Sequence, residues 1–205
     1  MRRAFLSMML FFPALLQAQE ATTEITAFGG YRFGGTFDVQ NTDSSYEWQD
    51  ASSFGLIWNQ AYKDNTEWEV FLAQQDSDAE LSGTATLDPN VSVETTTLQI
   101  GCTYLWEGTK AHRYLVATIG GTHIKADSQA PESDTFLSGS IGLGVKVAPT
   151  SRIGLRLEAR WHLVLTNNST DLFCQTGPDL NICAVKTEGN LFNQVETFAG
   201  VVVRF

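Results

Sequence analysis

The chain has 205 residues and a formal net charge of −10 at pH 7. A protein that binds nucleic acid presents a basic face, so this charge balance argues against a nucleic-acid partner. Beyond residue 18, no uncharged run has the length of a transmembrane helix. No internal repeat, low-complexity tract or linker divides the sequence, so we expect a single folded domain.

The first eighteen residues are typical of a cleaved secretory signal peptide. Arg2 and Arg3 form a charged start, residues 4–16 form an apolar core, and Ala18 completes a small-residue cleavage site. The apolar core is short for a membrane span, although a retained anchor is the alternative. We therefore expect a signal peptide over 1–18 and a mature domain over 19–205. An exported bacterial protein without a helical anchor is periplasmic, secreted or an outer-membrane β-barrel.

Alternating hydrophobicity recurs along the mature domain and predicts an all-β protein with eight strands. The clearest strand is the seventh, in which Ile153, Leu155 and Leu157 share one face and Arg156 and Glu158 share the other. In chain order the expected strands cover 24–33, 52–62, a stretch around 67–72, 93–106, 113–125, a stretch around 137–147, 153–165 and 194–205. Both faces of 113–125 are apolar, so its inward and outward faces stay open.

The expected connections alternate between long and short. Long polar loops are predicted at 38–50, 76–90, 127–134 and 166–191, and short turns at 63–65, 107–112 and 149–151. Outer-membrane barrels combine short periplasmic turns with long outer loops, and about eight strands is the smallest closed barrel. We therefore predict an eight-stranded, antiparallel, up-and-down transmembrane β-barrel. A soluble lipocalin-like barrel has the same strand pattern with the apolar face inside and is the alternative fold.

Large aromatic residues gather near the first two short turns. Amphipathic rings favour the membrane–water interface, so we interpret this group as the periplasmic aromatic girdle of the barrel. Residues of an ordinary core would be scattered along the strands instead. The group consists of Trp58, Tyr62, Trp68, Tyr104, Trp106 and Tyr114.

The last twelve residues alternate in the same way and end on Phe205. Gly200, Val203 and Phe205 match the C-terminal insertion signal of the small OmpA/OmpX-like outer-membrane β-barrels, also called the porin family, which this chain resembles. Phe198 stands where that signal has a polar residue. The resemblance implies a bacterial outer-membrane location, insertion by the barrel assembly machinery, and contact with outer-membrane lipids and lipopolysaccharide. We also expect a monomer.

If the apolar faces meet lipid, the charged side chains of the strands point into the barrel. Acids and bases are nearly balanced there, and an unpaired buried charge is costly, so we expect a salt-bridge network that plugs the lumen. A narrow pore or transporter for ions or small solutes is the alternative. The charged set is Glu24, Arg32, Glu67, Glu69, Lys146, Arg156, Glu158, Arg160, His162, Glu196 and Arg204.

The sequence gives little support for catalysis. His162 and Glu158 would lie inside a closed barrel, where a substrate has no access. Barrel enzymes that modify lipid A place a His and a Ser two residues apart, and no His-x-Ser occurs here. We expect no enzyme, no cofactor and no metal site, with a lipid-modifying enzyme as the less favoured alternative.

Two further features are the three cysteines and the acidic residues of the long loops. Cys174 and Cys183 flank a turn-rich segment, and an exported protein meets an oxidising compartment, so we predict a disulfide between them. Cys102 lies on an apolar face and is expected to meet lipid. The long loops are rich in Asp and Glu. They predict a solvated acidic surface, with an extracellular partner or divalent cations as the sharper alternative.

Overall fold

The computed structural model describes residues 23–38, 45–82, 90–127, 132–165, 174–177, 180–183 and 191–205. The predicted signal peptide, residues 1–18, lies outside this part of the chain. Within the described residues no helix is long and apolar enough to cross a membrane. The strands are β1 Thr23–Phe33, β2 Thr36–Asp38, β3 Ser45–Trp48, β4 Ala51–Lys63, β5 Thr66–Ser82, β6 Asn90–Trp106, β7 Ala111–Asp127, β8 Glu132–Val147, β9 Ile153–Leu165, β10 Cys174–Gly177, β11 Leu180–Cys183 and β12 Leu191–Arg204.

Ten of these strands form one closed antiparallel sheet. The first and last long strands pair along their length, with Ile25 opposite Val203 and Phe33 opposite Val195. The pairing of β5 with β6 closes the remaining side. β2 extends β1 and occupies the same strand position in the barrel, and β3 and β4 share another position. The ten strands therefore make an eight-stranded barrel wall. The predicted eight-stranded up-and-down barrel is therefore confirmed.

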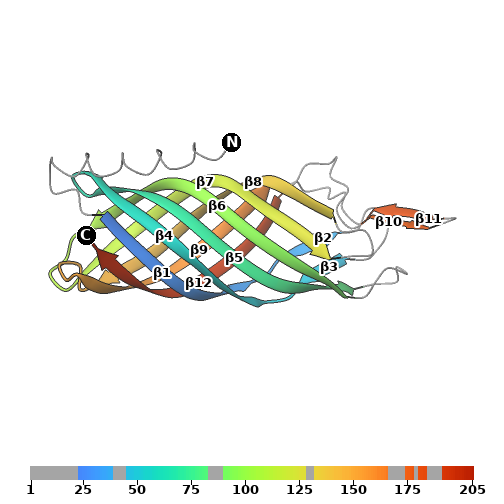
Figure 1. Cartoon of the computed structure of the whole chain (residues 1–205), viewed down its shortest axis with the longest axis horizontal. Helices are drawn as coiled ribbons and strands as arrows, with labels where there is room; N and C mark the ends of the chain where they lie inside the picture. The colour runs from blue at the N-terminus through green and yellow to red at the C-terminus, as the bar shows by residue number, and fades with distance from the viewer. Residues whose placement is uncertain are drawn as a thin grey trace, which may run out of the picture.

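The barrel is long, and its two ends differ (Figure 1). The C-terminus and the start of β1 lie at the end that carries the short connections, whereas the hairpin of β10 and β11 projects at the opposite end. The short turns fall at Asp64-Asn65, at 107–110 and at 148–152, as predicted. Asp64 and Ala148 adopt positive φ angles of 49° and 54° there.

A break separates β1 from β2 at Gly34-Gly35. The φ angles of these residues are 78° and 125°, a backbone region that side chains with a Cβ rarely adopt. A Cβ on Gly35 would also lie 2.4 Å from the ring of Phe192, which packs on the indole of Trp48 at a centroid distance of 5.0 Å. The break therefore lets the chain bend over an aromatic pair inside the barrel.

The strands on the long-loop side run further than the sequence predicted. The loop predicted at 76–90 was wrong, because β5 continues to Ser82 and β6 begins at Asn90. Likewise β7 ends at Asp127 and β8 begins at Glu132, and β2 and β3 occupy part of 38–50. A membrane-crossing strand needs about nine to eleven residues. The additional residues are part of the hydrogen-bonded barrel, but their outward side chains are polar. Alternating hydrophobicity therefore does not identify them as strand.

On three neighbouring strands, the outward side chains change from apolar to polar at the same height along the barrel. We call this height the exchange level. Leu98, Gly121 and Leu137 are cross-strand neighbours on the outside of β6, β7 and β8, and Thr96, His123 and Thr135 form the next outward row. Toward the short-turn end the outward residues are mostly apolar. Beyond this level the outward residues are polar, and apolar Val93, Ile124 and Phe136 join Thr95 and Thr122 on the inward face.

This exchange settles the ambiguous strand 113–125. Tyr114 and Val116 point inward and are buried, whereas Leu115 and Ile119 point outward. Ile124 is also inward, but it lies on the far side of the exchange. Both faces are apolar because the strand passes from one environment to another along its length.

Between that level and the short turns, the barrel is inverted relative to a soluble protein. Leu143 and Ile153 on the outside are 62% and 64% exposed, while Arg156, Arg160 and Glu69 inside are fully buried. A soluble lipocalin-like barrel would bury the apolar side chains and expose the charges. The distribution therefore fits a wall surrounded by lipid rather than by water.

Candidate functional site

All eleven predicted lumenal residues lie inside the barrel. Ten of them are buried, and the side chain of Glu67 is 13% exposed. They form three groups that follow one another from the short-turn end of the barrel toward its middle. Each group contains bases and acids from different strands.

The central group is a closed square of four charges. Glu69 and Glu158 each contact both Arg156 and Arg160. The four nitrogen–oxygen distances lie between 2.5 and 2.8 Å. Hydrogen bonds between charged partners in a low-dielectric interior are the strong kind, and here each arginine has two carboxylates.

This square spans the barrel from wall to wall. Glu69 comes from β5, and both arginines come from β9. Around the barrel, β4, β1 and β12 separate these strands on one side, and β6, β7 and β8 separate them on the other. The two strands therefore stand opposite each other, and their ion pairs cross the lumen.

Neutral side chains add hydrogen bonds to the square, in which Nη1 of Arg160 is buried without a hydrogen-bond partner among the described residues. Asn59 donates to Glu69 at 3.1 Å and accepts from Arg156 at 2.9 Å. Thr103 donates to Glu69 at 2.9 Å. Tyr114 donates to Glu158 at 2.6 Å and accepts from Arg156 at 2.8 Å. A buried ion pair contributes stability only when such additional hydrogen bonds satisfy the remaining polar atoms.

Aromatic rings pack against the same arginines. The guanidinium carbon of Arg160 lies 4.1 Å from the ring centroid of Phe71, and that of Arg156 lies 4.7 Å from the centroid of Tyr114. Phe71 belongs to a buried apolar cluster with Phe28, Ile57, Ala73 and Phe198. The lumen therefore holds charged and apolar side chains in direct contact, which gives the guanidinium groups cation–π partners.

The group nearest the short turns joins both ends of the domain. Lys146 donates to Glu24 and to Glu67, each at 2.5 Å. Arg204, the penultimate residue, donates to the other oxygen of Glu24 at 2.6 Å and to the carbonyl of Ser151 at 2.8 Å. This group ties β1, β5, β8 and β12 to the last short turn.

The third group contains the histidine. His162 is hydrogen-bonded to Glu196 at 2.8 Å, and Arg32 pairs with the same carboxylate at 3.3 Å. Ser140 lies opposite His162 on β8, yet its hydroxyl bonds Thr118 and Gln99. A buried His–Glu pair without a nucleophile bonded to the ring has the geometry of a structural contact.

Among the described residues, no group of three or more His, Cys, Asp or Glu side chains is arranged to hold a metal ion.

Comparison with known proteins gives matches at the level of structure. No family model matches the sequence, and no curated protein matches it. Neisserial surface protein A is similar in structure, with a TM-score of 0.60 and 14% identity over 89% of this chain and 97% of its own. The outer membrane protein OprG from Pseudomonas aeruginosa gives a TM-score of 0.59 and 12% identity over 89% and 95%. Ail of Yersinia pestis gives 0.51 and 13% over 91% and 100%.

The chain has the fold of the small outer-membrane β-barrels. These likenesses concern the fold, because all three identities are below 25%.

In this outer-membrane-type barrel, five of the six predicted girdle residues point outward near the short turns. They are Trp58, Tyr62, Trp68, Tyr104 and Trp106, all exposed. Two neighbouring pairs are in edge-to-face contact, Tyr62 with Trp68 and Tyr104 with Trp106. The prediction was wrong for Tyr114, which is only 1% exposed and is hydrogen-bonded to the charged square. It lies on the opposite face of β7 from Arg113 and Leu115.

The C-terminal strand of the barrel separates the residues of the predicted insertion signal. Val203 and Phe205 are on the outward side, and Phe205 is exposed. Gly200 faces inward, where a Cβ would approach Thr26 and Phe28 within 3 Å. Phe198, the residue that departs from the signal, packs on Phe28 at a ring distance of 4.3 Å. Packing inside the barrel therefore accounts for an aromatic residue at that position.

The cysteines occupy two different parts of the barrel. Cys102 is free, exposed and on the outward face of β6, as expected. In the hairpin of β10 and β11, the backbone register places Cys174 opposite Cys183. The disulfide between them stays a prediction.

Three neutral residues that are hydrogen-bonded to the charged square were not predicted as lumenal residues from the sequence. Asn59, Thr103 and Tyr114 all lie on the inward parity of their strands, and only the charged members of that parity were selected. Phe28, Ile57, Phe71 and Phe198 are inward too, despite being apolar. The alternation of residues along each strand would have predicted all of them, once it was known which face of the strand points into the barrel.

Proposed function

We propose that this chain is an integral protein of the bacterial outer membrane, with a closed lumen and a structural or surface-interaction role. The observation that carries the proposal is the inverted barrel: apolar side chains surround a wall whose interior is a network of ion pairs. Such an arrangement is stable in lipid, where outward charges are destabilising and inward ones are tolerated. The fold shared with outer-membrane proteins supports the same location.

The orientation follows from the two ends of the barrel. Short connections are periplasmic and long ones are external in outer-membrane barrels. The aromatic residues near the short turns then lie at the inner interface, and the level where the wall changes character marks the outer interface. Outer-membrane lipids and lipopolysaccharide are the surroundings, and the barrel assembly machinery is the partner during insertion.

The square of charges supports the proposed closed lumen. Ion pairs between β5 and β9 cross the barrel, and packed aromatic rings flank them. An eight-stranded barrel has an interior just wide enough for side chains to fill. A solute that passed through would have to break several buried charge contacts at once.

Any specificity of the protein belongs to its outer end. Exposed acids such as Asp76, Asp78 and Asp134 lie in the part of the wall beyond the level of exchange. The structural neighbour Ail was crystallised with the heparin analogue sucrose octasulfate. The acidic outer end of the present chain favours a partner of opposite sign, that is, a basic one.

We expect purified protein in planar lipid bilayers to show no steady single-channel conductance. The control is the folded state of the same preparation, verified by its altered electrophoretic mobility when it is not boiled. Steady conductance from verified folded protein would overturn the closed lumen and favour the alternative function, a narrow pore for ions or small solutes.

A further inference from the structure

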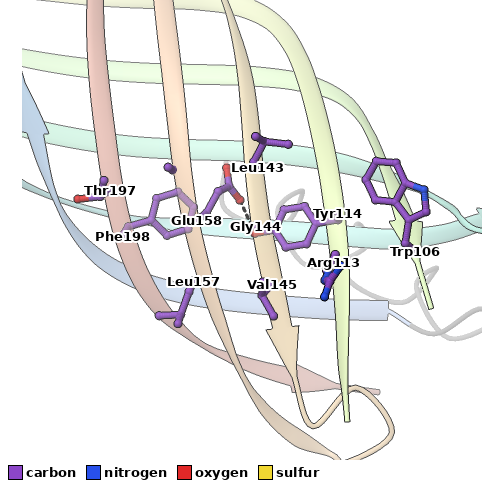
Figure 2. A pocket seen from close by; sticks show the side chains of 11 residues that line it. Trp106, Arg113, Tyr114, Leu143, Gly144, Val145, Leu157, Glu158, Thr197 and Phe198 are labelled. Carbon is purple, nitrogen blue, oxygen red and sulfur yellow. Dashed lines mark hydrogen bonds between the residues drawn. The ribbon is translucent and has the colours of Figure 1, made fainter. Parts of the chain in front are cut away.

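The outer wall of the barrel contains a hollow of about 860 Å³ over β7, β8, β9 and β12 (Figure 2). Its lining is mostly apolar, but its two ends differ. Trp106 and Arg113 lie at one end, near the short turns, and Thr197 lies at the other. Phe198 also borders that end, although its ring points into the lumen. The hollow therefore has a cationic, aromatic end and an end whose outward side chains are small and uncharged.

The hollow follows the hydrogen-bonding direction of the sheet. Trp106, Arg113, Val145, Leu157 and Ala199 are successive cross-strand neighbours on the outer face. Strands in a barrel are tilted, so such a row climbs along the wall. Arg113 stands two residues from the start of β7 at Ala111, whereas Ala199 stands well inside β12. The row therefore leads from the rim toward the middle of the wall.

Small side chains form the floor of the hollow. In the neighbouring outward row, Leu143 is followed by Ala159 and Thr197. Ala159 and Gly144 both line the hollow, and neither carries a large side chain that would fill it. An elongated apolar groove of this kind fits a flexible hydrocarbon chain better than it fits a second flat wall.

Arg113 supplies the charge at the rim. Its side chain is exposed, and among the described residues it has no ion-pair partner. Trp106 lies directly beside it on β6 and belongs to the outward aromatic group. Arginine binds phosphate through several donors, and tryptophan prefers the level of lipid headgroups.

We propose that this hollow binds one glycerophospholipid of the inner leaflet, with the phosphate at Arg113 and an acyl chain over Ala159 and Thr197. The inference rests on the proposed function, because the wall must face a bilayer with its short turns on the periplasmic side. Lipopolysaccharide occupies the other leaflet, and the position of Arg113 near the short turns therefore selects a phospholipid.

Native mass spectrometry of the detergent-solubilised full chain tests the site with two probes, dioleoyl phosphatidylglycerol and dioleoylglycerol, which share acyl chains and differ in the phosphate. Wild-type protein is expected to retain one phosphatidylglycerol and at least about tenfold less dioleoylglycerol. Arg113→Gln removes the charge and is expected to lower phosphatidylglycerol retention about tenfold. Ala159→Leu fills the floor and is expected to lower it as well. The matched control is Lys63→Gln, at an exposed lysine beside another short turn, which should retain lipid like the wild type.

Equal retention of phosphatidylglycerol by the wild type and Arg113→Gln would overturn the proposal. So would equal retention of the two probes by the wild type, or a dimer mass that disappears in Ala159→Leu, since a second copy would then occupy the hollow. Electrophoretic mobility without boiling is measured on every variant. Folded protein without selective lipid retention defeats this inference alone, whereas protein that never folds in detergent or lipid defeats the proposed function.

Discussion

Glu69→Ala is expected to lower the free energy of unfolding by about 3–5 kcal/mol, the range for removal of one partner from a buried ion pair. Glu69 neutralises Arg156 and Arg160 together and also accepts hydrogen bonds from Asn59 and Thr103. Its loss leaves two buried guanidinium groups with Glu158 as their shared carboxylate. Reversible urea unfolding of protein in lipid vesicles, followed by tryptophan fluorescence, measures the change.

Glu94→Ala is the matched control on the neighbouring strand. Glu94 pairs with Lys125 at 3.3 Å, but the two side chains are 41% and 55% exposed. Exposed ion pairs contribute about 0–1 kcal/mol, so this variant is expected to unfold close to the wild type. Equal effects of the two substitutions would show that the charged square has no special part in the stability of the barrel.

Phe198→Ala is expected to lower the free energy of unfolding by about 3–5 kcal/mol through loss of a buried ring and the cavity left behind. Phe198 packs on Phe28 inside the barrel, and its ring centroid lies 6.0 Å from the guanidinium carbons of both Arg156 and Arg160. The same urea unfolding experiment measures the loss.

Phe198→Leu serves as the control because it keeps most of the apolar volume. A substitution of this kind costs less than about 1.5 kcal/mol when the neighbours can adjust. The alanine variant is expected to lose at least twice as much free energy of unfolding as the leucine variant. If both variants matched the wild type, the aromatic cluster would not be a packed part of the lumen.

The sequence predicted the parts of the fold in which one face of a strand meets lipid. In 153–165 every second residue is apolar, and the structure places those residues outward and the charges inward. The pattern is reliable there because lipid demands apolar side chains along the whole outer face. The charged members of the lumen were found by the same parity.

The remaining parts depend on where the environment changes along a strand. On β7, Ile119 and Ile124 are both apolar, although one faces outward below the exchange level and the other inward above it. A single period-two pattern cannot describe such a strand, and the wall beyond 76 was therefore mistaken for a loop. Tyr114 was misassigned for a related reason. Tyrosine is suited both to a membrane interface and to a buried hydrogen bond. Its environment can be assigned only when it is known which face of β7 points inward.

The partners within the charged square could not be inferred from the sequence. Glu69 meets Arg156 and Arg160 because β5 and β9 stand opposite each other in a closed barrel. That relation depends on the number of strands in the barrel and on their register, which cannot be read from a local sequence pattern. Balance of charge predicted that a network exists, and the register decided its members.

The most direct test of which face meets lipid uses the free cysteine on the outer wall. A nitroxide is attached to Cys102 in the unfolded chain, with Cys174 and Cys183 replaced by alanine, and the protein is refolded into liposomes. If the outer wall faces lipid, the nitroxide collides often with oxygen, which dissolves in lipid, and rarely with a water-soluble nickel chelate. A label at Lys63→Cys, beside a short turn, should collide with the chelate readily. Free access of the nickel chelate to the label at Cys102 would contradict the account, because the apolar wall would then be facing water.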